Sequence, residues 1–244
     1  MKRYLFCISF NGFRYSGWQV QKNSITIQKI VQDVFESVVG VRSDVVSCSR
    51  TDSGVHAINF YFHVDFKLRM SLNRLQFAIN NKLPKDILLK SVVPVKDSFH
   101  ARHSVKKKEY IYKIWNSNLK NPFLNGLALQ YNRKINFEVI LKAAKFLIGE
   151  HDFSSFCCYK SKAIDKVRTI YDIDVKRKEE MVFFKVVGNG FLYNMVRIII
   201  GTLLEVSEGK FLAEDVKHIL QEKNRSLAGR TISAEGLYLS DVIY

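Results

Sequence analysis

The hydrophobic positions in the first half of the chain follow two periods, one typical of strands and one typical of helices. Residues 3–10 alternate as a strand does, and apolar residues then recur three and four apart from Ile27 to Val38, where Gly40 is placed to end a helix. Similar patterns follow down to residue 95. The predicted elements are strands 3–10, 45–49, 57–66 and 87–95, with helices 27–38 and 72–79. Their order is β-α-β-β-α-β.

The second half repeats this order of elements without evident sequence identity to the first. The predicted strands are 110–115, 167–176, 181–187 and 236–242, and the predicted helices are 137–148, 193–206 and 212–221. Two β-α-β-β-α-β units predict an α+β protein with two ferredoxin-like halves, residues 1–105 and 106–244, each an antiparallel sheet backed by helices. Because no Gly-, Ser- or Pro-rich linker separates the halves, we expect them to share a central cleft.

The composition points to a polyanionic partner. The chain has 38 Lys+Arg against 23 Asp+Glu, a net charge of +15, together with 18 Phe, 11 Tyr and 2 Trp. This combination favours nucleic acid first and an anionic membrane surface second. The longest apolar run, residues 198–204, is too short to span a bilayer, and the N-terminus has no cleavage pattern. We therefore expect a cytoplasmic protein without a membrane segment.

The four cysteines give no sign of a metal site. Cys7, Cys48, Cys157 and Cys158 form no CxxC pair, and no His lies at zinc-ligand spacing. We expect reduced and mostly buried thiols, with a redox switch at the adjacent pair as the alternative. No metal is predicted.

The most unusual polar segment, residues 49–57, lies between two predicted strands. Asp52 follows Arg50 by two residues, and Gly54 gives the backbone freedom to turn. A carboxylate here can act as a nucleophile or general base if a cation such as Arg50 keeps it ionised. An Asx-type turn is the plainer interpretation, and the local residues favour it.

A second segment, residues 188–197, is a Gly-rich turn that leads into an apolar helix. It matches neither the GxGxxG nor the GxxxxGK[ST] pattern, so it gives little support to nucleotide-cofactor binding. Arg197 in this apolar helix needs an anionic partner if its guanidinium is buried, and Asp52 is a candidate. The alternative is that Arg197 extends to the helix edge.

Basic and aromatic residues occur together at several places. Residues 99–103 run into 106–112, and further cations lie at 160–168 and 176–178. Each run alone is typical of a solvated face. Together with the aromatic loop 10–20, which contains Phe13, Tyr15 and Trp18, they favour RNA. Two rivals are a non-catalytic RNA chaperone and an aspartate-nucleophile hydrolase, although the loop lacks the paired carboxylates of a Mg²⁺ site.

The segment SRTDSGVHA at 49–57 resembles the catalytic motif of the TruA family of tRNA pseudouridine synthases, usually GRTDAGVHA. Further blocks follow in the family's order from the first strand to the last, and their joint occurrence is highly specific. These blocks are GWQ at 17–19, FHAR at 99–102, KEY at 108–110, GEHDF at 149–153, GNGFLYNMVR at 188–197 and AEGLYL at 234–239.

The resemblance implies conversion of uridine to pseudouridine at positions 38, 39 and 40 of the tRNA anticodon stem-loop, by a homodimer without cofactor. Residue by residue, it implies that Asp52 is the catalytic carboxylate and that Arg50 helps to hold the target nucleotide out of the stack. Tyr110 would stack on the uracil ring and could serve in proton transfer. Arg197 would pair with Asp52 and keep it ionised, and Leu237 would line the base pocket.

The chain departs from the family pattern at a few positions that carry no catalytic group. Ser49 and Ser53 replace Gly and Ala, Asn11 replaces Asp, Tyr193 stands where His is common, and Arg230 where Pro is usual. These departures leave the range of substrates open.

The implied reaction detaches uracil at N1 and rejoins it at C5 without a change in oxidation state. Three routes for the aspartate remain open: attack at C1′, attack at C6, or removal of a sugar proton to give a glycal.

Overall fold

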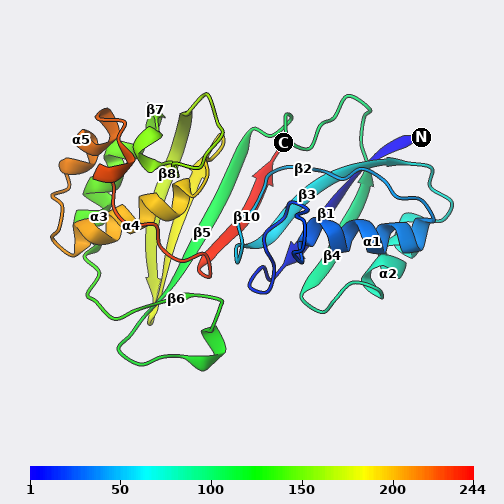
Figure 1. The fold of residues 1–244 in the computed structure, drawn as a ribbon. Coiled ribbons are helices and arrows are strands. Elements are labelled where there is room, and N and C mark those ends of the chain that lie inside the picture. The colour runs from blue at the N-terminus through cyan, green and yellow to red at the C-terminus, as the bar shows by residue number, and fades with distance from the viewer. The chain divides into compact units, whose positions relative to one another are not determined.

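The computed structural model describes residues 1–244, which divide into two compact units (Figure 1). The first unit contains Met1–Lys106 and Tyr238–Tyr244, and the second contains Lys107–Leu237. The protein is therefore a mixed α+β chain, as predicted. The division differs from the predicted halves at the end of the chain, where Tyr238 and Leu239 pair with His56 and Ala57 of the first unit.

The first unit has the predicted β-α-β-β-α-β order. Its elements are β1 (Lys2–Phe10), α1 (Ile27–Val39), β2 (Val46–Ser47), β3 (His56–Phe66), α2 (Leu72–Asn80) and β4 (Ile87–Pro94), with β10 (Leu237–Ile243) added from Tyr238 onward. The strands are ordered β4-β1-β3 with β2 on the far edge of β3, and all these pairs are antiparallel. This arrangement is the ferredoxin-like sheet, to which β10 adds a parallel strand on β3.

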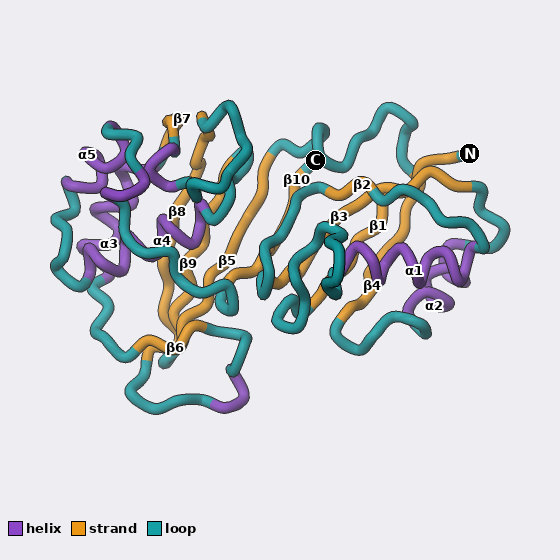
Figure 2. The backbone as a smooth tube through the Cα atoms, viewed as in Figure 1, coloured by secondary structure: helices purple, strands orange, loops and turns teal.

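Local sequence explains the helix boundaries of this unit. Gly40 ends α1 in the left-handed conformation with φ 82°, and the Ser71 side chain accepts a hydrogen bond from the Arg74 amide at the start of α2. Figure 2 shows the two helices beside the strands. Buried aromatic rings fill the space beneath α1. Phe6 stacks on Phe62 at 5.0 Å and meets the edge of Phe35 at 5.9 Å.

The second unit has an antiparallel sheet in the order β5-β9-β8-β7 and a short strand, β6, that pairs with β5 in parallel. Its strands are β5 (Lys107–Asn116), β6 (Leu129–Tyr131), β7 (Gly149–Asp152), β8 (Val167–Lys178) and β9 (Met181–Gly188), and its helices are α3 (Phe137–Ala144), α4 (Met195–Ser207) and α5 (Asp215–Gln221). The predicted hairpin is present, but its strands continue to Lys178 and Met181, which pair. The turn is therefore only Glu179–Glu180, with Glu179 at φ 54°.

Three predicted helices are shorter than expected. Helix α3 ends at Ala144 and a 3-10 turn continues to Leu147, while α5 starts at Asp215 instead of 212. Helix α4 starts at Met195 instead of 193, because Asn194 adopts the left-handed conformation with φ 61°. Strands β6 and β7 were not predicted.

Helix α4 is buried almost all round, as its sequence predicted. A Cβ added at Gly201 would lie 1.9 Å from the carbonyl oxygen of Arg230, so the glycine allows the segment that contains Arg230 to cross the helix in close contact. The amide of Gly229 donates to the Thr202 hydroxyl at 2.9 Å in the same crossing. None of the helices is long and apolar enough to cross a membrane.

Candidate active site

Asp52 lies in the loop that joins β2 to β3 in the first unit. Its side chain is half-buried, Arg50 is exposed, and Thr51 and Val55 on either side are buried. The Val55 amide donates to the Asp52 carbonyl at 3.1 Å, and Gly54 has φ 79°. A tight backbone turn is therefore present from Asp52 to Val55, two residues after the exposed cation Arg50.

A second segment, residues 12–18, runs along this loop and holds its backbone. The Trp18 amide donates to the Thr51 carbonyl at 3.1 Å, and the Gly54 amide donates to the Tyr15 carbonyl at 3.2 Å. The Ser53 hydroxyl donates to the same Tyr15 carbonyl at 3.2 Å. Asp52 is thus flanked on both sides by residues bonded to one neighbouring segment.

Two glycines make this close approach possible. A Cβ at Gly12 would lie 1.8 Å from the Val55 carbonyl oxygen, and a Cβ at Gly17 would lie 2.5 Å from that of Thr51. Gly17 also has φ +84°, a conformation that L side chains rarely adopt. Each side chain larger than hydrogen at these positions would push the two segments apart.

The aromatic residues of segment 12–18 are mostly part of the core, which corrects one expectation. Trp18 is 1% exposed and its ring lies 4.2 Å from that of Phe60, while Tyr15 is 7% exposed. Only Phe13, at 49%, is open to solvent. Trp18 and Tyr15 therefore support the loop and are not available to stack on RNA bases.

His56 connects the end of the loop to its surroundings in the first unit. Its Nδ1 accepts a hydrogen bond from the Gly12 amide at 3.1 Å, so Nδ1 carries no proton. Its ring stacks on Tyr238 with the centroids 4.4 Å apart. The histidine of the SRTDSGVHA motif thus helps to fix the loop.

In the second unit, Tyr110 lies on β5 and is 6% exposed. The Phe191 ring meets it edge-on at 5.1 Å. Phe191 belongs to the Gly-rich turn, which Asn189 fixes to β8: its amide donates to the Thr169 carbonyl, and its side-chain oxygen accepts from the Thr169 amide, both at 3.0 Å. The turn therefore sets the surroundings of Tyr110.

Arg197 lies in the first turn of α4, and acceptors within the second unit hold its guanidinium. Nε donates to the Ile232 carbonyl at 2.7 Å, and Nη1 donates to the Asn194 side-chain oxygen at 2.8 Å. Asn194 uses its side chain on Arg197 and does not cap the helix. The guanidinium is therefore oriented by two bonds, whereas the alternative expectation had it extending to the helix edge.

Leu237 is 5% exposed and follows a segment that is bound to β5. The Lys113 amide donates to the Gly236 carbonyl at 2.8 Å, and the Tyr112 hydroxyl donates to the Ser233 carbonyl at 2.7 Å. A Cβ at Gly236 would lie 2.5 Å from the Lys113 carbonyl oxygen. Burial also lowers the pKa of Lys113. Leu237, the first residue of β10, thus follows a segment that is bonded to β5, the strand that carries Tyr110.

The FHAR segment, predicted as a basic and aromatic surface, is partly built into the first unit. The Ala101 amide donates to Nδ1 of His63 at 3.1 Å, and the Tyr244 hydroxyl donates to the Ala101 carbonyl at 2.9 Å. Burial, with the charges of Arg3 and His100, lowers the pKa of His63 to about 4. Arg102 and His103 remain exposed for contact with a polyanion.

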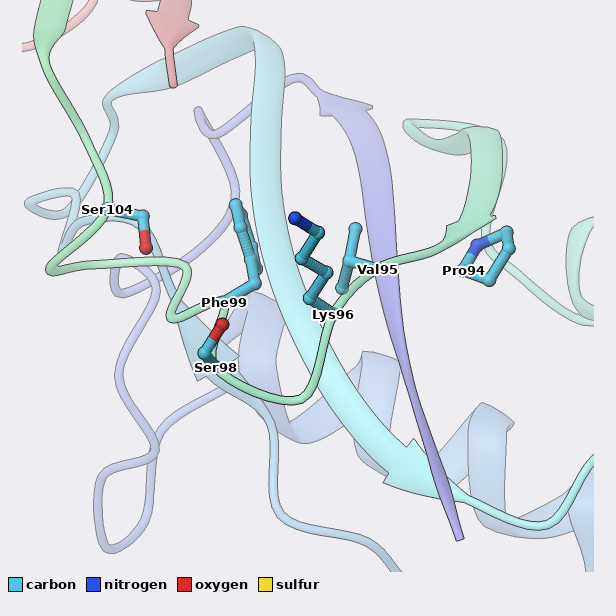
Figure 3. A pocket seen from close by; sticks show the side chains of 6 residues that line it. All are labelled: Pro94, Val95, Lys96, Ser98, Phe99 and Ser104. Atoms are coloured by element: carbon cyan, nitrogen blue, oxygen red, sulfur yellow. The ribbon is translucent and has the colours of Figure 1, made fainter.

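A wide, shallow hollow of about 720 Å³ lies beside this segment (Figure 3). Its lining residues are Pro94, Val95, Lys96, Ser98, Phe99 and Ser104. Lys96 is the only charged side chain in the lining, and the hollow contains none of the predicted site residues.

Comparison with known proteins decides the family. A family model described as tRNA pseudouridine synthase matches residues 143–244. A tRNA pseudouridine synthase A from Anoxybacillus flavithermus is 42% identical over 245 residues, which cover 100% of this chain and 99% of that protein. One from Thermoanaerobacter sp. (strain X514) is 38% identical over 244 residues and 100% of both chains. This chain belongs to the tRNA pseudouridine synthase A family.

The resemblance inferred from the motifs is thereby confirmed, and it places the chain in a family of isomerases. Among solved structures, the chain is similar to one described as a Cbf5-Nop10-Gar1 complex, with a TM-score of 0.37 and 11% sequence identity. That match covers 96% of this chain and 57% of the other.

Side-chain clusters with metal-ligand chemistry are absent from both units. No cluster of three or more His, Cys, Asp or Glu side chains could hold a metal ion. All four cysteines are free thiols, and only Cys158 is not fully buried.

Within each unit, the sequence interpretation missed several residues that hold the predicted site residues of that unit in place. These are Gly12, Gly17, Tyr15, Asp86, Asn189 and Asn194. For Gly17, Asn189 and Asn194 a signal was present, since they lie in the GWQ and GNGFLYNMVR blocks. Asp86 lies in no such block, and only its contacts identify it.

Proposed function

We propose that the chain converts uridine to pseudouridine at positions 38, 39 and 40 of the tRNA anticodon stem-loop, with Asp52 as the catalytic carboxylate. The observation that carries the proposal is the held loop. Asp52 is half-buried between Thr51 and Gly54, whose backbone groups are bonded to Trp18 and Tyr15. A fixed carboxylate can attack or take a proton at a defined atom without first ordering its loop.

Asp52 acts as an anion in each of the three routes: attack at C1′, attack at C6, and removal of a sugar proton to give a glycal. Partial burial alone would raise the pKa of a carboxyl group, so a cation is needed to keep it ionised. We assign this role to Arg197, whose guanidinium is already oriented by Ile232 and Asn194. The pairing of Arg197 with Asp52 is part of the proposal.

The target uridine has to leave the helical stack before its ring can turn. Unstacking costs about a few kcal/mol, which contacts with the backbone can offset. Arg50 is exposed next to Asp52 and is suited to hold the extruded nucleotide. Tyr110 would stack on the uracil ring and could move a proton, and Leu237 would line the base pocket. Because Tyr110 is 6% exposed, this role requires its ring to become accessible when the nucleotide enters.

The remaining cations have a plain role in this proposal. A net charge of +15 suits the phosphates of a tRNA stem. The reaction leaves the oxidation state of uracil unchanged, so the protein side chains suffice and no cofactor is assigned. We further propose that the protein works as a homodimer in the cytoplasm.

Release of tritium from tRNA labelled at C5 of uridine tests this function, because the carbon that loses its hydrogen is the one that forms the new glycosidic bond. The proposal expects release that EDTA does not reduce. A sequencing map of pseudouridine in tRNA from cells with and without the protein then tests the positions. Loss of pseudouridine at 38–40 alone supports the assignment, whereas loss elsewhere would contradict it.

A further inference from the structure

We infer that Tyr15 and Asp86 are positioning residues that set the place of Asp52, through a hydrogen bond between the Tyr15 hydroxyl and the Asp86 carboxylate. This inference rests on the proposed role of Asp52. It adds two residues that contact neither substrate nor reacting atoms but hold the backbone of the catalytic loop. The Tyr15 hydroxyl donates to Oδ1 of Asp86 at 2.6 Å.

The connection from Tyr15 to the loop is direct. The Tyr15 carbonyl accepts two hydrogen bonds, one from the Gly54 amide and one from the Ser53 hydroxyl, both at 3.2 Å. Ser53 and Gly54 are the two residues that follow Asp52. A shift of the Tyr15 backbone would therefore move the carboxylate of Asp52 with it.

The hydroxyl end of Tyr15 is equally well fixed. The side chain is 7% exposed, and burial together with the Asp86 carboxylate raises the pKa of Tyr15, so the hydroxyl remains a donor at neutral pH. Such a bond to a charged acceptor is stronger than one between neutral groups. It ties the side chain to one rotamer.

Asp86 is also bonded to Asn11, the residue directly before segment 12–18. Its carbonyl accepts a hydrogen bond from the Asn11 amide at 2.9 Å, at the end of β1. Asp86 lies just before β4, and the Ile87 amide donates to the Pro84 carbonyl in the turn that places it. The turn before β4 thus fixes both the start of the segment and its central tyrosine.

Because Tyr15 holds the loop of Asp52 and does not bind tRNA, its loss should lower the rate of the chemical step more than it weakens tRNA binding. Tyr15 is buried and bonded to Asp86 and is not one of the exposed cations that would contact tRNA phosphates, so loss of the bond should leave tRNA affinity nearly unchanged. A misplaced catalytic group, by contrast, lowers the rate of the chemical step even when the displacement is small, by up to about 100-fold for 1 Å. The expected signature is a lower kcat at a constant KM.

The chain offers a matched control. Tyr131 is 6% exposed and its hydroxyl donates to Oε1 of Glu208 at 2.8 Å, so it too is a buried tyrosine bound to a carboxylate. It lies in the second unit and bonds to no residue of the loop that holds Asp52. Tyr131→Phe therefore reports what the loss of such a bond does through stability alone.

The experiment compares single-turnover and steady-state tritium release by the full chain and its variants. For Tyr15→Phe we expect kcat to fall about tenfold with KM for tRNA within about twofold of the unchanged chain. Tyr131→Phe should shift the melting temperature by a similar amount and leave kcat unchanged. Equal kcat in Tyr15→Phe and the unchanged chain would overturn the inference, as would an equal loss in Tyr131→Phe.

Substitutions at Asp86 provide a second, independent arm. Asp86→Asn keeps an oxygen that can accept from Tyr15 and should retain most of kcat, whereas Asp86→Ala should match Tyr15→Phe. The double variant Tyr15→Phe/Asp86→Ala should be no slower than the slower single variant, because both remove one bond. Full additivity would contradict the pair. Lack of tritium release by the unchanged chain would instead contradict the proposed function.

Discussion

Gly17 packs against the peptide carbonyl of Thr51, the residue directly before Asp52. A Cβ at Gly17 would lie 2.5 Å from the Thr51 oxygen, and Gly17 already has φ +84°. The contact joins two backbones that are more than thirty residues apart in the chain, with no side chain between them. The geometry of the loop that carries Asp52 thus depends on a residue that contributes no functional group.

Gly17→Ala should consequently destabilise the protein far more than the same substitution at another glycine that has a similar left-handed conformation. Gly40 has φ +82° and nothing within 4 Å of its added Cβ, so Gly40→Ala carries only the left-handed strain of about 1 kcal/mol. For Gly17→Ala, strain and overlap together should lower the free energy of unfolding by about 3 kcal/mol. Chemical denaturation of both variants measures the difference, and equal losses would refute the close packing.

Arg197 should be replaceable neither by a neutral side chain nor by another cation. Lysine keeps the charge but cannot donate in the planar geometry that reaches both Ile232 and Asn194. We expect Arg197→Met to lower kcat by about 100-fold or more and Arg197→Lys to recover only part of this loss. The pH profile should also change in Arg197→Met, since Asp52 would lose the cation that we propose keeps it ionised. An unchanged rate and pH profile would show that the two residues are not partners.

Stability should fall as the pH drops from 6.5 toward 4, in part because of His63. The pKa of His63 in the folded chain is lowered to about 4 from 6.5, so in this window the unfolded chain binds a proton that the folded chain does not. The contribution of His63 to stability is therefore fully present above pH 6.5 and is lost progressively as the pH falls toward 4. At pH 4.5 the loss due to this one residue should be about 2–3 kcal/mol.

His63→Gln isolates that contribution, because glutamine can still accept from the Ala101 amide but does not titrate. The free energy of unfolding, measured at pH 7 and pH 4.5, should fall less in the variant than in the unchanged chain. A fall of the same size in both proteins would mean that His63 does not cause the acid sensitivity.

Most of the fold could be predicted because alternation and helical spacing record which face of each element is buried. Gly40 ends the first helix directly after Val39, as its residue type indicated, and the second helix begins at Leu72, as predicted. The strands β6 and β7 are only three and four residues long, too short for a period to be visible. The start of α4 was misplaced because Asn194 adopts the left-handed conformation and its side chain accepts from Arg197, neither of which the spacing of apolar residues records.

The candidate site, like the fold, could be predicted only in part. The motif around Asp52 could be recognised from consecutive residues, whereas the segment that holds the loop lies more than thirty residues earlier and acts mainly through backbone groups. An aromatic residue among polar ones fits either a core or a stacking surface. For Trp18 and Tyr15 the burial of their rings decided in favour of the core.

The most direct test of the proposed catalytic role of Asp52 is the variant Asp52→Asn, assayed for both tRNA binding and tritium release from C5-labelled uridine. Asparagine preserves the size of the side chain and the loop that Tyr15 and Trp18 hold, but it removes the negative charge that each proposed route requires. We expect tRNA affinity within about twofold of the unchanged chain and no tritium release above background. Substantial release by Asp52→Asn would contradict the assignment of this carboxylate as the catalytic group.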